Sequence, residues 1–265
     1  MNIVVIGECC KDVYVYGSCD RLCPEGPAPV FQPLRTEQYS GMAGNTYENI
    51  KAMCNDDDNV ELICQFKSHH FAMTKTRYVD ETSNQLLLRI DEGDDARRIG
   101  ERTKEAVISK FCGYGKTKAD LLIVSDYCKG FLGDQDLIDL SVIAEISILD
   151  TKKTLSQRVV NSFNFVKLNE SEFNRNKSIF SKLSNEMRAV ITKGSKGVSH
   201  MSMEYPPPKI HQTFDVSGAG DVFTAGFGYN LASGKSIGDS IKTAQQYCSK
   251  VIQKRGTCVY EKNMD

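Results

Sequence analysis

Residues 214–224 constrain this chain more than any other segment, and their sequence is Phe-Asp-Val-Ser-Gly-Ala-Gly-Asp-Val-Phe-Thr. A short polar turn with glycines at 218 and 220 runs into the apolar stretch 222–231, which predicts a buried helix. Glycines at a helix start let the backbone approach a ligand closely, and the exposed N–H groups and the helix dipole there favour an anion. The segment therefore predicts an anion-binding turn.

Asp221 directly follows the second glycine of this turn. In that positive field we expect its carboxylate to stay ionised at little cost and to accept a proton from a substrate hydroxyl. An anion site with a base beside it is what phosphoryl transfer to an alcohol requires. The pattern is also typical of an ordinary capped helix with a first-turn acid, and a lone Gly-x-Gly does not distinguish the two.

Size and composition fit one domain spanning residues 1–265. Lys+Arg 33 against Asp+Glu 34 leaves a net charge of −1, which indicates neither a nucleic-acid nor a membrane partner. The ten cysteines include no Cys-x-x-Cys, so free thiols are favoured over a zinc site. The apolar run 3–6 is too short for a signal peptide, and nothing approaches transmembrane length. We expect a soluble, cytoplasmic protein.

The order of elements predicts an α/β fold. Strands expected at 3–7, 60–66, 121–124, 146–150, 163–168 and 189–192 alternate with helices at 41–53, 97–112, 134–144, 218–233 and 237–254. This alternation predicts a parallel sheet covered on both faces, with ligands at the carboxyl ends of the strands. The alternating stretches within 12–36 and 74–91 fall outside that rhythm and predict a small β lid.

Polar segments follow several of these strands. Thr192 to Gly197 can offer backbone amides and charge to a polyphosphate, or can be an ordinary hairpin turn. Asn169 and Glu172 can hold water around a magnesium ion, and can equally form a helix capping box. Asp126 and Lys129 have the chemistry to bind a sugar hydroxyl and a phosphate, or are solvated loop charges. Asp12 and Asn45 are sugar-hydroxyl ligands or caps, and Gly41 belongs to a close-approach turn.

Together these segments resemble the ribokinase-like (PfkB) sugar kinases over nearly the whole chain. Residues 215–221 are similar to the family's second signature, 192–197 to its Thr-x-Gly-x-x-Gly phosphate loop, and 169–172 to its Asn-x-x-Glu magnesium motif. The resemblance implies a three-layer α/β/α fold with a mostly parallel central sheet and a small β lid. It also implies ATP and Mg²⁺ as cofactors.

Three further segments resemble the heptose 7-phosphate kinase branch, which forms one domain of bifunctional ADP-heptose synthesis proteins. They are 12–30 with Asp-Val-Tyr-Val-Tyr-Gly and Arg-Leu-Cys-Pro-Glu-Gly-Pro-Ala-Pro-Val, 85–91 with Gln-Leu-Leu-Leu-Arg-Ile-Asp, and 125–130 with Ser-Asp-Tyr-Cys-Lys-Gly. The resemblance implies ATP-dependent phosphorylation of the anomeric hydroxyl of D-glycero-D-manno-heptose 7-phosphate. The 1,7-bisphosphate formed would feed the heptose units of lipopolysaccharide core.

The resemblance also implies residue roles. The base is Asp221, and the anion hole is made by the amides of Gly218, Ala219 and Gly220. ATP and a water-bound magnesium ion are assigned to Asn169, Glu172, Thr192, Lys193, Gly194 and Gly197. The acceptor is assigned to Asp12, Gly41, Asn45 and Asp126. A distal phosphate dianion needs fixed positive charge, for which the candidates are Arg89, Lys129 and Lys152.

Three features depart from the family pattern. Gly41-Met42 replaces a paired glycine, so we expect the Met42 side chain to intrude on the substrate. Asp150-Thr151-Lys152 replaces Asp-Pro-Lys. Between residues 60 and 75 the chain is a helix and a strand shorter than usual, so we expect the main sheet to have lost an edge element. These departures keep two alternatives open: a kinase for another sugar, sugar phosphate or nucleoside, and a catalytically weak sugar- or nucleotide-binding protein.

Two expectations concern partners. Exposed lid strands have unpaired edges, which favours a homodimer through the lid. No His-x-Gly-His occurs among the histidines at 69, 70, 200 and 211, so we expect any nucleotidylyltransferase step on a separate chain.

Overall fold

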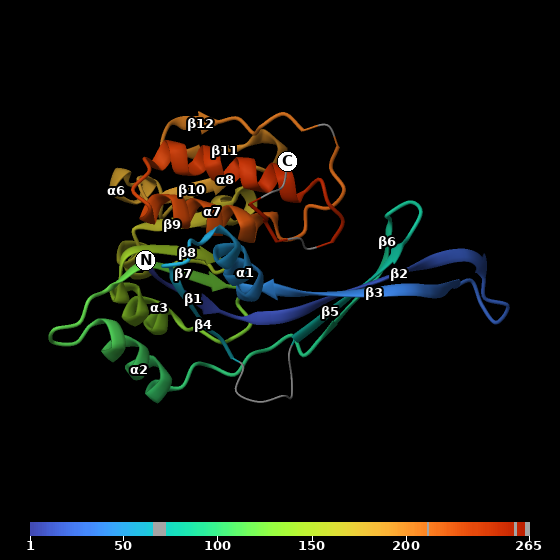
Figure 1. The fold of residues 1–265 in the computed structure, drawn as a ribbon, viewed down its shortest axis with the longest axis horizontal. Helices are drawn as coiled ribbons and strands as arrows, with labels where there is room; N and C mark the ends of the chain where they lie inside the picture. Colours follow the sequence, from blue (N-terminus) through green and yellow to red (C-terminus); the bar gives the residue numbers. More distant parts are fainter. Residues whose placement is uncertain (66–72, 211, 257–258, 263–265) are drawn as a thin grey trace.

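Two β-sheets organise the protein in the computed structural model, which describes residues 1–65, 73–210, 212–256 and 259–262 (Figure 1). The larger sheet has the order β12-β11-β10-β9-β8-β7-β1-β4, and the smaller has the order β3-β2-β5-β6. The strands are β1 (Asn2–Gly7), β2 (Cys9–Leu22), β3 (Pro29–Met42), β4 (Asn59–Ile63), β5 (Met73–Asp80), β6 (Leu86–Glu92), β7 (Ala119–Asp126), β8 (Ala144–Thr151), β9 (Phe165–Asn169), β10 (Ala189–Thr192), β11 (Val198–His200) and β12 (Met203–Tyr205).

The larger sheet is mostly parallel. All pairings from β4 through β10 are parallel, and β11 and β12 add antiparallel strands at one edge. Helices cover both faces: α1 (Ala43–Met53), α2 (Glu101–Phe111), α3 (Asp134–Leu140), α4 (Gln157–Ser162), α5 (Glu170–Asn176), α6 (Leu183–Glu186), α7 (Ala219–Ala232) and α8 (Ile237–Val251). Short 3₁₀ turns are η1 (Ser141–Ile143) and η2 (Gly194–Lys196). The predicted three-layer α/β/α fold is confirmed.

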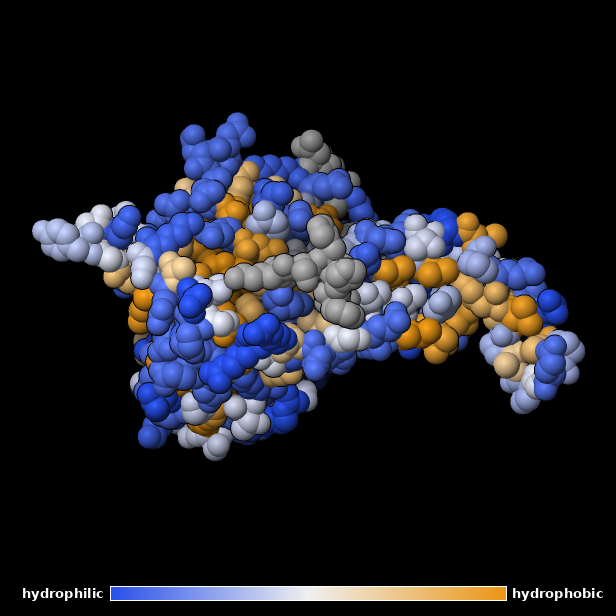
Figure 2. Space-filling model, turned by 90° about the horizontal axis from the view of Figure 1, so that it is seen from below, coloured by the Kyte–Doolittle hydropathy of each residue, from blue (hydrophilic) through white to orange (hydrophobic). Residues whose placement is uncertain are grey.

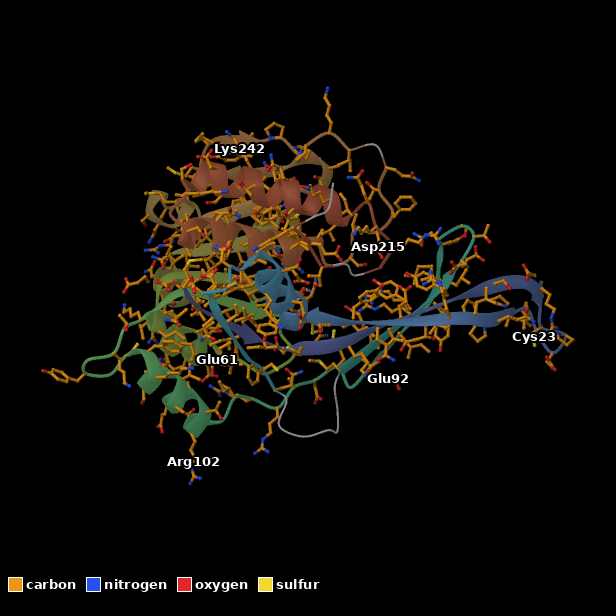
Figure 3. The ribbon with its side chains drawn as sticks, in the orientation of Figure 1. Cys23, Glu61, Glu92, Arg102, Asp215 and Lys242 are labelled. Carbon is orange, nitrogen blue, oxygen red and sulfur yellow. The ribbon has the colours of Figure 1, made fainter. Side chains whose placement is uncertain are left out.

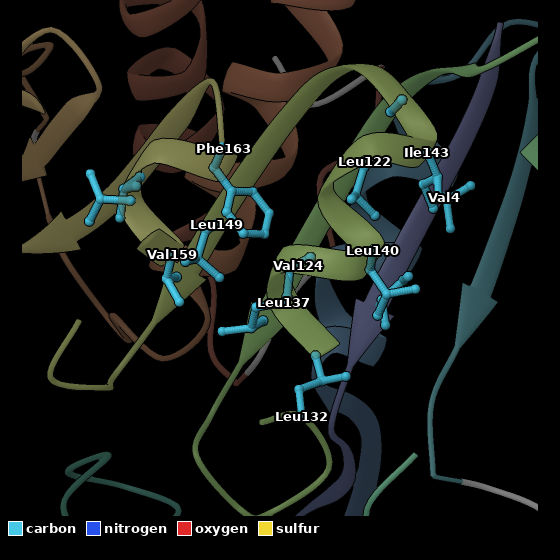
Figure 4. Packing of buried hydrophobic residues seen from close by; sticks show 14 of the residues in the cluster. Val4, Leu122, Val124, Leu132, Leu137, Leu140, Ile143, Leu149, Val159 and Phe163 are labelled. Atoms are coloured by element: carbon cyan, nitrogen blue, oxygen red, sulfur yellow. The ribbon is translucent and has the colours of Figure 1, made fainter. Parts of the chain in front are cut away.

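Alternation along the buried strands divides the core into two clusters. Val4 and Ile6 of β1 pack with the α3 and α4 side, whereas Ile3 and Val5 pack with α1, α7 and α8. Figure 4 shows the first cluster, in which Leu137 and Leu140 of α3 cover the sheet. Because both faces are covered, β1 and the middle of β7 are continuously apolar, as in a buried parallel sheet.

The smaller sheet projects from the core as the predicted lid (Figure 1). Cys23 lies near its far end, and Asp215 lies in a core loop that faces β6 (Figure 3). Cross-strand register gives the lid an inner face with Asp12, Tyr14, Lys75, Arg77, Arg89 and Asp91. The outer face includes the exposed Leu88 and Ile90, and apolar atoms are visible along the lid surface in Figure 2.

Some boundaries differ from the expectation. The helix expected at 134–144 ends at Leu140 and continues as a 3₁₀ turn, and the helix expected at 97–112 begins only at Glu101. Residues 66–72 lie outside the described part, including the end of the strand expected at 60–66 and the histidines at 69 and 70. β4 forms the edge of the larger sheet among the described strands, and the lost edge element stays a prediction. No described helix is long and apolar enough to cross a membrane.

Candidate active site

Helix α7 begins at the glycine turn singled out by the sequence. Gly218, its N-cap, has φ 78°, in the left-handed region that favours glycine. The Ala219 amide donates to the carbonyl of Val216 at 3.2 Å, so this N–H is already engaged in the turn. The amides of Gly218 and Gly220 are therefore better placed to bind an anion than that of Ala219.

Asp221 is the buried acid of the first turn of α7 and is 4% exposed. Its Oδ1 accepts from the hydroxyl of Tyr127 at 2.6 Å, and its Oδ2 accepts from Nδ2 of Asn45 at 2.9 Å. Burial raises the pKa of Asp221 to about 6, although both hydrogen bonds lower it. The expectation that the helix start keeps this carboxylate ionised at little cost is wrong, because desolvation outweighs the stabilising groups.

A buried cation lies beneath the same turn. The ammonium of Lys167 in β9 lies 2.9 Å from Oδ2 of Asp150, which also accepts from the Thr224 hydroxyl at 2.8 Å. A side-chain carbon on Gly220 would lie 3.2 Å from that ammonium. Lys167 therefore adds positive charge below the turn, and a side chain at 220 would crowd it.

A cavity of about 730 Å³ opens beside the start of α7. Its walls come from β10, η2, residues 207–210, 213 and 216, α7 and α8. They include Thr192, Gly194, Gly197, Ala219 and Gly220 from the predicted set. The lining is largely apolar, with Phe223, Cys248 and Ile252 among its members. Such a site suits a flat organic ring with polar groups at one end.

Lys193 does not line this cavity. Its ammonium lies 2.7 Å from a carboxylate oxygen of Glu204, and the residue borders a separate cavity of about 280 Å³ with Glu170 and Glu186. The segment 192–197 is also the hairpin turn between β10 and β11. The backbone of this turn, rather than the Lys193 side chain, faces the larger cavity.

Asn169 and Glu172 form the capping box of α5. The Glu172 amide donates to Oδ1 of Asn169 at 2.8 Å, and the Asn169 amide donates to Oε2 of Glu172 at 2.7 Å. Among the described residues, no group of three or more His, Cys, Asp or Glu could hold a metal. The donors fit a hydrated Mg²⁺ that shares ligands with phosphates better than an all-protein cage.

Asp12 and Gly41, two of the residues assigned to binding the acceptor substrate, lie next to each other on the lid side of Asp221. Asp12 forms a 2.5 Å ion pair with Arg77 across neighbouring lid strands. A side-chain carbon on Gly41 would lie 2.4 Å from Oδ2 of Asp12 and 2.5 Å from Sγ of Cys10, so glycine is required there. Asn45, also assigned to the acceptor, donates a hydrogen bond to Asp221 instead of standing free.

Met42 does not intrude on the cleft. Its φ of 58° is strained for a residue with a side chain, and glycine would adopt it without strain. The side chain is 3% exposed and packs with Cys10 and Met73 at the root of the lid. The expected obstruction is therefore wrong, because this side chain is buried in the core.

The remaining predicted residues have partners of their own. Asp126 is buried and accepts from the Thr151 hydroxyl at 2.7 Å. Lys129 is paired with Asp94, and Arg89 is paired with Asp91 through contacts of 2.6 and 2.7 Å. The ammonium of Lys152 instead lies 4.1 Å from the centroid of the Tyr127 ring.

Comparison with known proteins places this geometry in a family. Residues 139–263, which contain the α7 turn and the cavity walls, match the pfkB family carbohydrate kinases. The chain is similar to this family over that part of its length. It is 27% identical to the bifunctional protein HldE of Campylobacter curvus over 299 residues, covering 97% of this chain, and 26% identical to HldE of Escherichia coli O9:H4. The chain spans about 62% of the length of these relatives.

Solved structures show the same fold. Ribokinase of Arabidopsis thaliana in complex with ribose and ATP superposes with a TM-score of 0.67 at 17% identity, covering 99% of this chain and 96% of that one. Phosphofructokinase-2 of Escherichia coli gives a TM-score of 0.73 at 13% identity, with the same coverage. The chain therefore has the ribokinase-like fold.

Sequence reasoning missed several groups of this site. Glu8 is fully buried and accepts from the amides of Tyr127, Lys129 and Phe131, which fixes the loop that carries Tyr127. Its place directly after the first strand was the available signal. Tyr127 lies within the 125–130 motif and Lys167 lies just before the 169–172 motif, but nothing in their spacing shows that they meet Asp221 or α7.

Proposed function

We propose that this chain transfers the γ-phosphoryl group of ATP to the anomeric hydroxyl of D-glycero-D-manno-heptose 7-phosphate. The observation that carries the proposal is the position of Asp221, a buried base at the glycine turn with the apolar cavity on one side and the charged lid on the other. The likeness to HldE along 97% of the chain supports a heptose acceptor over a generic one.

In the proposed reaction, Asp221 takes the proton of the acceptor hydroxyl as the new O–P bond forms. Asn45 and Tyr127 hold the two oxygens of the carboxylate, so its orientation is fixed before the acceptor arrives. The acceptor hydroxyl has to share or replace the bond that Tyr127 makes to Oδ1. The amides of Gly218 and Gly220, with Lys167 below them, stabilise the charge on the transferred group.

The nucleotide occupies the 730 Å³ cavity, with its ring against the apolar wall and its phosphates directed to the start of α7. Asn169 and Glu172 would hold Mg²⁺ through water at the phosphate end. The ion would supply charge neutralisation of the phosphates.

A second candidate keeps this chemistry and changes the acceptor to another sugar, a sugar phosphate or a nucleoside. The similar structures include a ribokinase and a nucleoside kinase of Methanocaldococcus jannaschii, at 17% and 15% identity. The 299-residue alignment is longer than this chain, so HldE carries residues that this chain lacks. The residues missing from this chain favour an acceptor other than that of HldE.

A coupled assay of ADP release tests both candidates. Purified protein is given ATP, Mg²⁺ and a panel of heptose 7-phosphate, ribose, fructose 6-phosphate and nucleosides, and ³¹P NMR locates the new phosphate. We expect the highest kcat/KM with heptose 7-phosphate and a product phosphorylated at the anomeric carbon. Turnover of ribose or fructose 6-phosphate without the heptose would contradict the first proposal in favour of the second.

Two partner proposals follow. We propose a homodimer through the lid, whose outer face exposes Leu88 and Ile90. Light scattering of Leu88→Glu should then show a smaller species than the parent protein. For the nucleotidylyltransferase step, HldE is described as bifunctional, and we propose that here a separate chain supplies it.

A further inference from the structure

Lys75 is a buried cation that forms no ion pair with any residue that the structure describes. The residue lies in β5 and is 9% exposed, and its ammonium likewise forms no hydrogen bond within the described part of the chain. The ammonium lies 5.6 Å from the centroid of the Tyr127 ring. Burying a charge outside an ion pair is costly, so a cation in this position suits an anionic ligand.

The neighbouring charges of the lid's inner face do not supply that anion. Asp12 stands opposite Lys75 but is paired with Arg77 at 2.5 Å, and Asp91 stands opposite on the other side but is paired with Arg89. Each of these two carboxylates thus has an arginine within ion-pair distance. The charge of Lys75 helps to lower the pKa of Asp91, but Lys75 forms an ion pair with neither carboxylate.

Lys152 brings a second cation to the same place from the core. Its ammonium lies 4.1 Å from the centroid of the ring that Lys75 also contacts. Desolvation and then the charge of Lys75 lower the pKa of Lys152, and the carboxylates of Asp150, Glu172 and Asp221 act in the opposite direction. Lys152 is exposed to solvent, so a ligand can reach it.

We propose that Lys75 and Lys152 bind the phosphate group of a phosphorylated acceptor and make the enzyme selective for phosphorylated over free sugars. A phosphate dianion between them satisfies both ammoniums and removes their repulsion. The inference rests on the proposed sugar kinase function, and it names Lys75 in place of Arg89 and Lys129, whose charges are already neutralised.

The position of Lys75 favours the acceptor over the nucleotide as its ligand. Lys75 belongs to the lid, whereas the 730 Å³ cavity is built entirely from core residues between 192 and 252. Tyr127 places the pair next to the base, because its ring contacts both ammoniums and its hydroxyl contacts Asp221. An acceptor whose hydroxyl reaches Asp221 therefore has the two cations alongside it.

The test compares a sugar phosphate with the same sugar lacking the phosphate. Lys75→Met and Lys152→Met remove the charge and keep an apolar stem. Lys11→Met is the matched control, because Lys11 lies on the same lid but shares the face of Thr74, opposite to Lys75. We expect KM for the sugar phosphate to rise at least tenfold in each variant and KM for the free sugar to stay within twofold. Lys75→Arg should recover most of the loss.

Equal losses for both acceptors would overturn the proposal, because the lysines would then act on the transferred group or on the fold. Lys152→Met covers the case in which Lys75→Met fails to fold, since Lys152 is exposed. A second measurement uses inorganic phosphate and calorimetry with the nucleotide cavity saturated by an ATP analogue. Phosphate binding that is weakened tenfold in both variants but kept in Lys11→Met supports the site, and binding unchanged in the variants overturns it.

These outcomes separate the two proposals. If heptose 7-phosphate is inactive but another sugar phosphate is turned over with the same dependence on Lys75, the assigned acceptor is wrong and the phosphate site stands. If heptose 7-phosphate is turned over equally well by Lys75→Met and Lys152→Met, the acceptor stands and the phosphate site is wrong.

Discussion

The two sides of Asp221 are built in different ways. The cavity side is made by a glycine turn, a hairpin turn and an apolar wall, all between residues 192 and 252. The lid side is made by side-chain charges from β2, β5, β6 and the loop after β7, which are far apart in sequence. In the proposed function, backbone and shape hold the nucleotide, whereas fixed charges recognise the acceptor.

Replacing Asp221, which lies between the two sides, has the largest expected effect on activity. Asp221→Asn removes the base that both sides share, so kcat should fall by at least about 10³-fold while the Kd for ATP changes little. Stopped-flow kinetics and nucleotide calorimetry measure the two quantities. Near-normal turnover would show that a residue other than Asp221 is the base.

The same substitution should stabilise the protein. Burial raises the pKa of Asp221 from its ordinary value of 3.8 to about 6 in the folded protein. Between these values the folded state binds more protons than the unfolded state, so stability falls as pH rises through that window. Two pKa units correspond to about 3 kcal/mol, which Asp221→Asn should recover above pH 7. The Tyr127 hydroxyl can accept as well as donate, so it can bond to the new amide.

Denaturant unfolding of both proteins at pH 4 and pH 8 checks this prediction. The variant should gain stability over the parent only at the higher pH. A gain that is equal at both pH values would mean that the buried charge is not its source.

Two glycine variants test whether the two sides act separately. A side chain at position 41 would overlap Asp12, so Gly41→Ala should raise KM for the acceptor by roughly 10- to 30-fold with ATP affinity kept. A side chain at position 220 would press on Lys167, so Gly220→Ala should weaken ATP binding and leave acceptor KM nearly unchanged. Initial-rate kinetics with each substrate varied gives both constants. If each variant affects both substrates equally, the two sides are coupled.

The difference between the two sides of Asp221 also explains which features the sequence predicts. The cavity-side turns depend on local features, such as the glycine at 218 that must adopt a left-handed conformation, and these are visible in the sequence. The order of strands and helices could also be predicted, because buried parallel strands appear in the sequence as apolar runs. The lid itself was predicted from alternating stretches, and its four strands are found.

The lid-side contacts were not predictable in this way. That Arg77 pairs with Asp12, that Lys75 is left alone, and that Tyr127 reaches Asp221 all depend on register and on how the lid meets the core. Spacing along the chain gives no such information. The same limit explains why the sequence indicates Lys129 and Arg89 as phosphate ligands. Their charge is visible in the sequence, but their pairing with Asp94 and Asp91 is not.

Tyr127 links the two sides, and its removal should have the smallest of these effects. Glu8 anchors its backbone in the lid-side loop, while its hydroxyl bonds to Asp221 and lowers the pKa of that carboxyl. In Tyr127→Phe the pKa of Asp221 should therefore rise above about 6, moving the acid limb of the pH–rate profile to higher pH by roughly half a unit to one unit. Because a deprotonated base is needed, activity should drop most at pH 6 and approach the parent value at pH 8.5. The profile of kcat/KM measures this shift, with Tyr78→Phe on the outer face of the lid as the control. An unshifted acid limb with a uniform loss at every pH would mean that Tyr127 serves only to shape the acceptor side.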